Sequence, residues 1–259
     1  MLLNGKVAIV SGVGPGMGRD TALALATHGA DVVLMARSEE VVIGVAPEIE
    51  AVGRKACIVL GDITDQGACE RVAKVAAEEF GRIDILVNNA FFQGERKPLM
   101  EVESDDWRRV LEVNLLGSMN MTRAVVPFME ERGEGRIIMV NSMQGLRTVP
   151  GGFGPYASSK AALASITKTL AYELGPKGIR VNGIHPGMIM GDALRGYFHH
   201  LAKEQGCSYE EIHQSISSES ALGYIPDSQE YSGTVVYLAS DLGKPVTGQS
   251  IVTDAGAFR

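Results

Sequence analysis

The sequence has few cysteines, and it lacks any apolar stretch long enough to cross a membrane. Its three cysteines are odd in number and lie far apart among the 259 residues, at Cys57, Cys69 and Cys207. That spacing excludes a disulfide framework and a zinc cluster. The apolar run that ends at Ser11 is too short to span a bilayer, and no small-residue cleavage site follows it. We therefore expect a cytoplasmic protein in reducing surroundings.

The chain also lacks an excess of positive charge. Its net charge is −7 and its pI is about 5.3, whereas proteins that bind nucleic acid or anionic membranes present a basic face. Its histidines show no metal-ligand spacing with acidic or cysteine partners; they are His28, His185, His199, His200 and His213. The sequence thus predicts no nucleic-acid partner, no membrane partner and no bound metal.

What the sequence does contain is an alternation of short apolar runs and helical patterns. Runs rich in β-branched residues are typical of strands buried on both faces, and they recur at 7–10, 32–35, 56–60, 85–87, 137–140, 179–184 and 250–253. Helical periods lie between them, at 19–28, 65–80, 107–129, 157–174 and 228–240. Such alternation predicts an α/β fold with a doubly wound (Rossmann-type) parallel sheet of about seven strands. Because the chain has no linker, we expect residues 1–259 to form one domain.

One segment, at about 190–222, interrupts this alternation with a mostly helical run of polar and aromatic residues. It follows the strand expected at 179–184, and ligands of doubly wound sheets gather at the carboxyl ends of the strands. Because helical segments often close over such sites, we expect this one to be a substrate lid.

A glycine-rich turn follows the first expected strand. It spans residues 11–18 with the sequence SGVGPGMG, and a helical pattern begins directly after it. Glycines let the backbone turn sharply and approach a pyrophosphate, whose charge then meets free N–H groups and the positive end of the helix. A merely structural turn is the alternative, but the strand before it and the helix after it favour a dinucleotide site.

Tyr156 and Lys160 are four residues apart in a stretch of helical pattern. This spacing places both side chains on one helix face, within reach of the same ligand. A free tyrosine titrates near pH ~10, so a phenolate at neutral pH needs nearby positive charge, which Lys160 and an oxidised nicotinamide ring together supply. Tyr156 would then exchange a proton with an alcohol or a ketone. A solvated helix face is the alternative.

Several motifs in register resemble the short-chain dehydrogenase/reductase family. The glycine turn has that family's spacing, at Gly12, Gly16 and Gly18. Further marks of the family follow in chain order: Asp62, Asn88-Asn89-Ala90, Asn114, Ser142, the Tyr156 and Lys160 pair, and Pro186-Gly187. The resemblance runs from about residue 6 to residue 256. It implies an NAD(P)-dependent oxidoreductase acting on CH–OH groups, assembled as a homotetramer or homodimer.

The resemblance also assigns roles to individual residues. The expected catalytic residues are Asn114, Ser142, Tyr156 and Lys160. Ser142 would hydrogen-bond the substrate oxygen, Lys160 would also hold the nicotinamide ribose, and Asn114 would position a water that connects Lys160 to solvent. From the residues alone, Asn114 bending its helix and Ser142 ending a strand are the alternatives. The expected cofactor site comprises Ser11, Gly12, Gly16, Met17, Gly18, Arg37, Asp62, Ile63, Asn89, Ala90, Tyr156, Lys160, Pro186, Gly187 and Ile189.

Two positions depart from the family pattern. Phe91 stands where the family usually has glycine, and Gly191 stands where a threonine commonly contacts the cofactor carboxamide. We expect Phe91 to narrow the cofactor or substrate cleft, and the missing threonine puts one nicotinamide contact in doubt.

The residues after the second expected strand bear on the choice of cofactor. Relatives that prefer NAD carry an aspartate there, which repels a 2′-phosphate. In this chain the position is Ala36, followed by Arg37 and Ser38, a cation and a hydroxyl suited to a phosphate. We expect NADP(H) to be favoured, with NAD(H) as the alternative if Arg37 only stacks on the adenine.

The expected substrate site is mostly apolar. It comprises Ser142, Met143, Gln144, Phe153, Tyr156, Met188, Met190 and Tyr197, which favours a small hydrophobic alcohol or ketone, cyclic or steroid-like. A second hypothesis is 3-oxoacyl-[acyl-carrier-protein] reduction, which needs basic residues at the mouth of the site; Arg147 and Arg195 are the candidates. A third hypothesis is a non-catalytic regulator that binds a dinucleotide. Such a protein would tolerate the loss of catalytic residues, whereas all four are present in this sequence.

Overall fold

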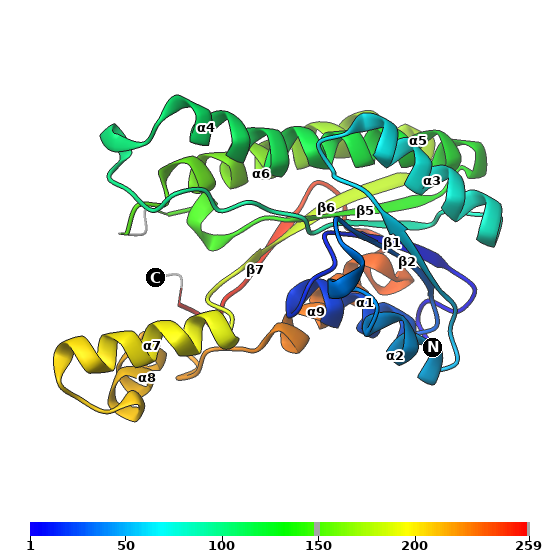
Figure 1. The fold of residues 1–259 in the computed structure, drawn as a ribbon. Helices are drawn as coiled ribbons and strands as arrows, with labels where there is room; N and C mark the ends of the chain where they lie inside the picture. Colours follow the sequence, from blue (N-terminus) through cyan, green and yellow to red (C-terminus); the bar gives the residue numbers. More distant parts are fainter. Residues whose placement is uncertain (148–150, 258–259) are drawn as a thin grey trace.

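The centre of the molecule is a parallel seven-stranded sheet in the order β3-β2-β1-β4-β5-β6-β7 (Figure 1). The computed structural model describes residues 1–147 and 151–257. The strands are β1 (Val7–Ser11), β2 (Asp31–Ala36), β3 (Ala56–Leu60), β4 (Ile85–Asn88), β5 (Gly135–Val140), β6 (Ile179–Pro186) and β7 (Ser250–Thr253). Each predicted strand lies within two residues of these bounds, so the predicted doubly wound sheet is confirmed.

Helices cover both faces of the sheet (Figure 1). One layer contains α1 (Met17–Thr27), α2 (Val45–Ala51) and α9 (Ser228–Ala239), and the other contains α3 (Gln66–Phe80), α4 (Ser104–Leu111), α5 (Ser118–Arg132) and α6 (Gly154–Leu174). Successive residues of β5 alternate between the two layers: Ile138 packs in the core beside α1 and α9, and Ile137 packs in the core beside α3 and α5. This alternation explains why the strands are continuous apolar runs.

The helix predicted at 107–129 differs from the observed one. It begins earlier, at Ser104, and a π-helical turn, Glu112–Gly117, separates α4 from α5. Such turns insert a residue into the helical ladder and occur frequently at functional sites. Apolar periodicity does not reveal them, because one extra residue only rotates the buried face.

The segment at 190–222 forms two helices, α7 (Asp192–Gln205) and α8 (Tyr209–Ser217). They share a small core of their own around Phe198, Ala202, Ile212 and Ile225. Figure 1 shows them set apart from both helical layers, at the lower left of the view. Among all the helices described, none is both long and apolar enough to cross a membrane.

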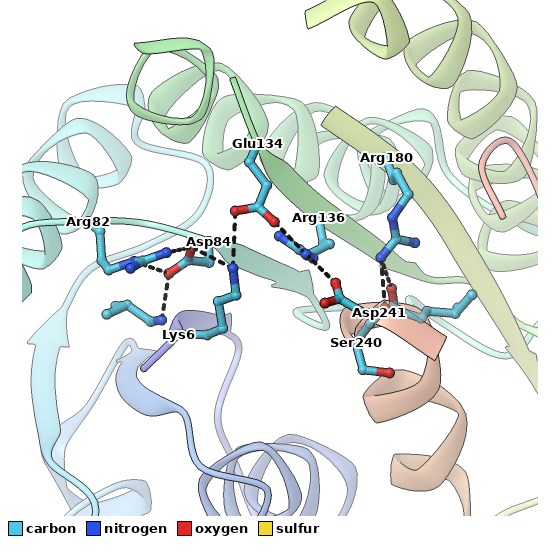
Figure 2. Close-up of polar contacts among 10 residues, drawn as sticks. Lys6, Arg82, Asp84, Glu134, Arg136, Arg180, Ser240 and Asp241 are labelled. Atoms are coloured by element: carbon cyan, nitrogen blue, oxygen red, sulfur yellow. Dashed lines mark hydrogen bonds and ion pairs between the residues drawn. The ribbon is translucent and has the colours of Figure 1, made fainter. Parts of the chain in front are cut away.

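Buried charges join the amino ends of the central strands (Figure 2). Asp84, just before β4, is fully buried, accepts from the backbone N–H of Val7 at 2.9 Å and pairs with Arg82 at 2.5 Å. Arg136 of β5 is 5% exposed and lies 2.7 Å from Glu134 and 3.0 Å from Asp241. These contacts link β1, β4, β5 and the end of α9. The charges can be buried because each has a partner of opposite sign.

Replacing Glu134 tests the contribution of this network. Hydrogen bonds from Arg136, the larger cause, and from Lys6 lower the pKa of the Glu134 carboxyl from 4.5 to about 2. Its partial burial acts in the opposite direction and raises this pKa. A lowered carboxyl pKa stabilises the fold above pH 4.5, and that stability is lost as the pH falls toward 2. Because Glu134 is partly exposed and screened, we expect Glu134→Gln to lower the free energy of unfolding by about 1 kcal/mol at neutral pH.

The measurement is urea unfolding near pH ~7 and pH ~3, where the stabilities of wild type and Glu134→Gln should approach each other at the lower pH. Glu131→Gln, an exposed position on the last turn of α5, is the matched control. A difference that stays constant with pH would contradict the assignment.

Candidate active site

A cavity of about 330 Å³ lies at the carboxyl ends of the first four strands. Its walls come from the loops that follow β1, β2, β3 and β4, and from the helix α4 with its π-helical turn. Of the predicted cofactor residues, it is lined by Gly12, Arg37, Asp62, Ile63 and Ala90. Sequence reasoning missed several further lining residues, among them Val41, Phe92, Arg109 and Val113.

The glycine turn leaves its backbone open to this cavity. Gly12 has φ +76°, and a Cβ there would lie 2.4 Å from the Cα of Ala90, so only glycine fits. At Gly14 and Gly16 a Cβ would meet nothing within 4 Å, which leaves space next to the start of α1. Open backbone at a helix N-terminus fits the pyrophosphate of a dinucleotide.

The remaining predicted cofactor residues are placed differently. Ser11 is fully buried and its hydroxyl donates to the Val87 carbonyl at 3.3 Å. Asn89 donates from its amide to the Gly12 carbonyl at 2.8 Å, so it holds the glycine turn. The others stand outside the walls of the 330 Å³ cavity: Gly16, Met17, Gly18, Tyr156, Lys160, Pro186, Gly187 and Ile189.

The cavity carries charge of both signs at one end. Arg109 on α4 lies 3.8 Å from Asp62, and Arg37 is close enough to act on the same carboxylate. Burial raises the pKa of Asp62, but hydrogen bonds from Thr64 and the two arginines outweigh burial, and the pKa is lowered. Asp62 therefore remains an acceptor for a ligand N–H group, with arginines beside it.

The predicted catalytic residues Ser142, Tyr156 and Lys160 come together where β5 meets α6. Lys160 is 1% exposed, donates to the Val140 carbonyl at 2.6 Å, and lies 5.6 Å from the centroid of the Tyr156 ring. Ser142 lies close enough to Tyr156 to act on its pKa, and its hydroxyl accepts from the backbone N–H of Gln144 at 3.2 Å. The helical spacing thus places both side chains inward rather than on a solvated face.

Burial shifts the pKa values of this pair toward the neutral forms. It raises the pKa of Tyr156 to about 12, although the Ser142 hydrogen bond acts in the opposite direction. It lowers the pKa of Lys160 to about 7. Both shifts favour the neutral forms, so the lowered tyrosine pKa expected from the sequence is not what this geometry gives.

Asn114 lies in the π-helical turn and is fully buried. Its amide oxygen accepts from the Phe92 N–H at 2.7 Å, and its amide nitrogen donates to the Phe92 carbonyl at 2.9 Å and to Ser159 Oγ at 2.8 Å. Ser159 in turn donates to the Tyr156 carbonyl at 2.7 Å. Asn114 therefore joins the segment after β4 to the helix that carries Tyr156.

His185 is a residue of this site that sequence reasoning missed. It is 1% exposed, and its Nδ1 lies 2.8 Å from the Ser142 carbonyl. Because a carbonyl only accepts, Nδ1 carries the proton. Burial lowers the pKa of His185, as does the charge of Lys160, against the opposing effect of the Ser142 bond. The alternation of β6 side chains, which places Val181 beside α6, is the signal that points to it.

The predicted substrate residues lie in several different surroundings. Gln144 and Phe153 line a second cavity of about 560 Å³, between the Lys97–Leu99 stretch, the loop after β5 and the start of α6. Arg96 lies over the Phe153 ring, 4.3 Å from its centroid. Met188 and Met190 instead pack against the small core of α7 and α8. The structure therefore does not gather all of these residues in one pocket: Met143 is buried, and Tyr197 is 44% exposed on α7.

Comparisons with known proteins agree with this geometry. A family model described as enoyl-(acyl carrier protein) reductase matches residues 12–257. A 3-oxoacyl-[acyl-carrier-protein] reductase of Thermotoga maritima is 34% identical over 259 residues, covering 99% of each chain. A 7α-hydroxysteroid dehydrogenase of Escherichia coli is 33% identical over 257 residues, covering 99% of this chain and 96% of that one.

Solved structures show the same likeness. L-sorbose reductase from Gluconobacter frateurii, complexed with NADPH and L-sorbose, has a TM-score of 0.93 and 29% identity, covering 100% of this chain and 99% of that one. Fold, cavity and relatives together define an oxidoreductase that acts on CH–OH or C=O groups. Within that class, the chain belongs to the short-chain dehydrogenase/reductase family, whose members bind nicotinamide cofactors.

The buried lysine has a consequence for stability. Its pKa falls from 10.5 in the unfolded chain to about 7 in the folded one. Between these values the unfolded chain binds more protons, so stability rises with pH through this window, and the full cost of burying the charge is present below pH 7. We expect Lys160→Met to stabilise the cofactor-free protein, by about 2 to 3 kcal/mol more at pH ~6 than at pH ~9.

Urea unfolding at the two pH values measures this difference. Lys168→Met, at an exposed position of the same helix, is the matched control and should show no such pH dependence. If the stabilities of wild type and Lys160→Met differ by the same amount at both pH values, the charge of Lys160 is not buried at a cost.

Proposed function

We propose that this protein transfers a hydride between a nicotinamide cofactor, preferably NADP(H), and a hydrophobic secondary alcohol or ketone, with Tyr156 as general acid and base. The observation that carries the proposal is the buried Lys160 beside the Tyr156 ring, with Ser142 close enough to the tyrosine to lower its pKa. A buried lysine with a lowered pKa next to a tyrosine is typical of a functional site.

In the alcohol-oxidising direction, Tyr156 takes the proton from the substrate hydroxyl, and in ketone reduction it returns that proton to the oxygen. Ser142 donates to the substrate oxygen where negative charge develops. His185 fixes the backbone that carries Ser142 by donating to its carbonyl. When bound, the nicotinamide supplies the hydride exchange and, in its oxidised form, a positive charge that favours the Tyr156 phenolate.

Asn114 acts through its contacts with Phe92 and Ser159, and through them it positions the helix of Tyr156. Its side-chain amide atoms are occupied by these protein partners, so the proposed water relay to Lys160 would use other atoms of the turn. Lys160 would hold the nicotinamide ribose and would move from the Val140 carbonyl toward it.

The substrate class follows from the apolar residues near the site. Met188 and Met190 follow β6 and pack against the small core of α7 and α8, and Tyr197 is exposed on α7; we propose that these two helices act as a substrate lid. An apolar cover suits a cyclic or steroid-like substrate, and the E. coli relative is named for a hydroxysteroid. Exposed Leu116 and Tyr172 on the outer layer would pack against a sister subunit in a dimer or tetramer.

A second candidate is 3-oxoacyl-[acyl-carrier-protein] reduction, favoured by the T. maritima relative. Lys97 and Arg147 line the second cavity, as an acidic carrier would require. However, Lys97 pairs with Glu95 and lies in the field of Glu103 and Asp106. This local negative charge disfavours an acidic partner at that mouth, so we place this activity second.

Turnover with a panel of substrates tests the proposal. Cyclic and steroidal alcohols and ketones, with an acyl-thioester ketone as the alternative substrate, are each followed by nicotinamide absorbance with NADPH and NADH. Tyr156→Phe removes the proton donor and is expected to lower kcat by about 10²–10⁴-fold, with cofactor affinity nearly unchanged. Tyr237→Phe, in the last turn of α9, is the matched control. The enzyme hypothesis fails if no substrate turns over and Tyr156→Phe changes only cofactor affinity.

Cofactor preference has its own test. Arg37 and Ser38 line the cavity where β2 ends, and Ala36 leaves no carboxylate there to repel a 2′-phosphate. We expect Arg37→Ala to weaken NADPH binding about 10- to 100-fold and NADH binding much less, because only NADPH loses a charge-assisted bond. Calorimetric titration of both cofactors gives the measurement, and Arg71→Ala on the exposed face of α3 is the control. Equal losses would show that Arg37 merely stacks on the adenine.

A further inference from the structure

Phe91 is the position where this chain departs from the family glycine, and the structure shows where its side chain lies. The ring is 61% exposed and lines the 330 Å³ cavity. Its edge meets the Tyr156 ring, with the centroids 6.1 Å apart and the planes at 70°. One side chain thus reaches from the wall of the cavity to the predicted catalytic tyrosine.

The backbone that presents Phe91 is held on both sides. Ala90 packs directly on Gly12 of the glycine turn, where even a Cβ would not fit. On the other side, Asn114 takes both backbone polar groups of Phe92, at 2.7 and 2.9 Å. The exposed Phe91 ring is therefore held in place, because buried partners fix the backbone of its neighbours Ala90 and Phe92.

Exposed apolar side chains gather at this cavity. Val41 and Phe92 are each 39% exposed and line it together with Phe91. Scattered exposed apolar residues need no explanation, but several in one concave site are typical of a surface that a ligand covers. The glycine turn beside them leaves open backbone for a pyrophosphate, so the ligand that reaches all three has the chemistry of a dinucleotide.

We propose that Phe91 is a cofactor-contacting residue that packs against the middle of the bound dinucleotide, between the adenine end at Asp62 and Tyr156. This inference rests on the proposed function, because it requires a nicotinamide dinucleotide in the cavity. Phe91 covers apolar sugar surface that a glycine leaves bare and excludes water from the Tyr156 side of the cofactor. It thereby adds affinity for the intact dinucleotide over its adenosine half.

The test compares NADPH with adenosine 2′,5′-bisphosphate, which carries only the adenosine half, by calorimetry on the full-length protein. Phe91→Ala is expected to weaken NADPH about tenfold and the bisphosphate less than about twofold, as loss of roughly half of the exposed ring surface implies. Phe91→Leu, which keeps part of the apolar surface, is expected to lie between the two. Leu242→Ala, which removes an apolar side chain that is 60% exposed and lines neither cavity, is the matched control and should change neither ligand.

Unchanged NADPH affinity in Phe91→Ala, with only the substrate KM altered, would overturn the proposal and place the ring in the substrate site. An equal loss for both ligands would also overturn it, because Phe91 would then serve the adenine end. Wild-type protein that binds neither NADPH nor NADH would instead refute the proposed function. Since Phe91 is mostly exposed, the variants are expected to unfold at the wild-type temperature, and a lowered midpoint would assign the residue to packing instead.

Discussion

The burial of one cation constrains the whole carboxyl edge of the sheet. The Lys160 ammonium is 1% exposed and donates to the Val140 carbonyl at 2.6 Å. A carbonyl offers less compensation than a carboxylate, and so burial lowers the pKa of Lys160 to about 7. To hold this geometry, β5 has to end at Val140 and α6 has to pass over that end. The turn that carries Ser142 then lies between β5 and α6. It is next to Tyr156, which stands one helical turn before Lys160.

Asn114 extends this constraint across the molecule. Through one amide it fixes the segment after β4 and, by way of Ser159, the start of α6. The π-helical turn makes this possible, because it changes the direction in which the Asn114 side chain leaves the helix. The alternative that Asn114 only bends its helix is therefore incomplete. The π-helical turn does depart from regular helix geometry, and this departure brings the Asn114 amide to both Phe92 and Ser159.

Much of this could be predicted from the sequence, for physical reasons. Strands buried on both faces are continuous β-branched runs, so β1 to β7 were located to within two residues. The prediction that Tyr156 and Lys160 lie side by side depends only on helical spacing. By contrast, Arg109 reaches Asp62 from a helical layer, and His185 on β6 contacts Ser142 after the neighbouring strand β5. Such contacts depend on how layers are rotated against each other. The same limit explains why the sequence does not show that Gln144 and Phe153 line a cavity separate from the one beside Gly12.

Buried charges are compensated differently at the two ends of the sheet. At the amino ends, Asp84 and Arg136 are each matched by opposite charges, and the pairs join strands and helices (Figure 2). At the carboxyl ends, Lys160 is buried against the Val140 carbonyl, and no carboxylate pairs with it among the described residues. An unmatched charge costs stability, and a site that keeps one does so because a ligand completes it. Paired charges therefore stabilise the amino end of the sheet, whereas the carboxyl end, where we propose that the cofactor binds, buries a cation without a carboxylate partner.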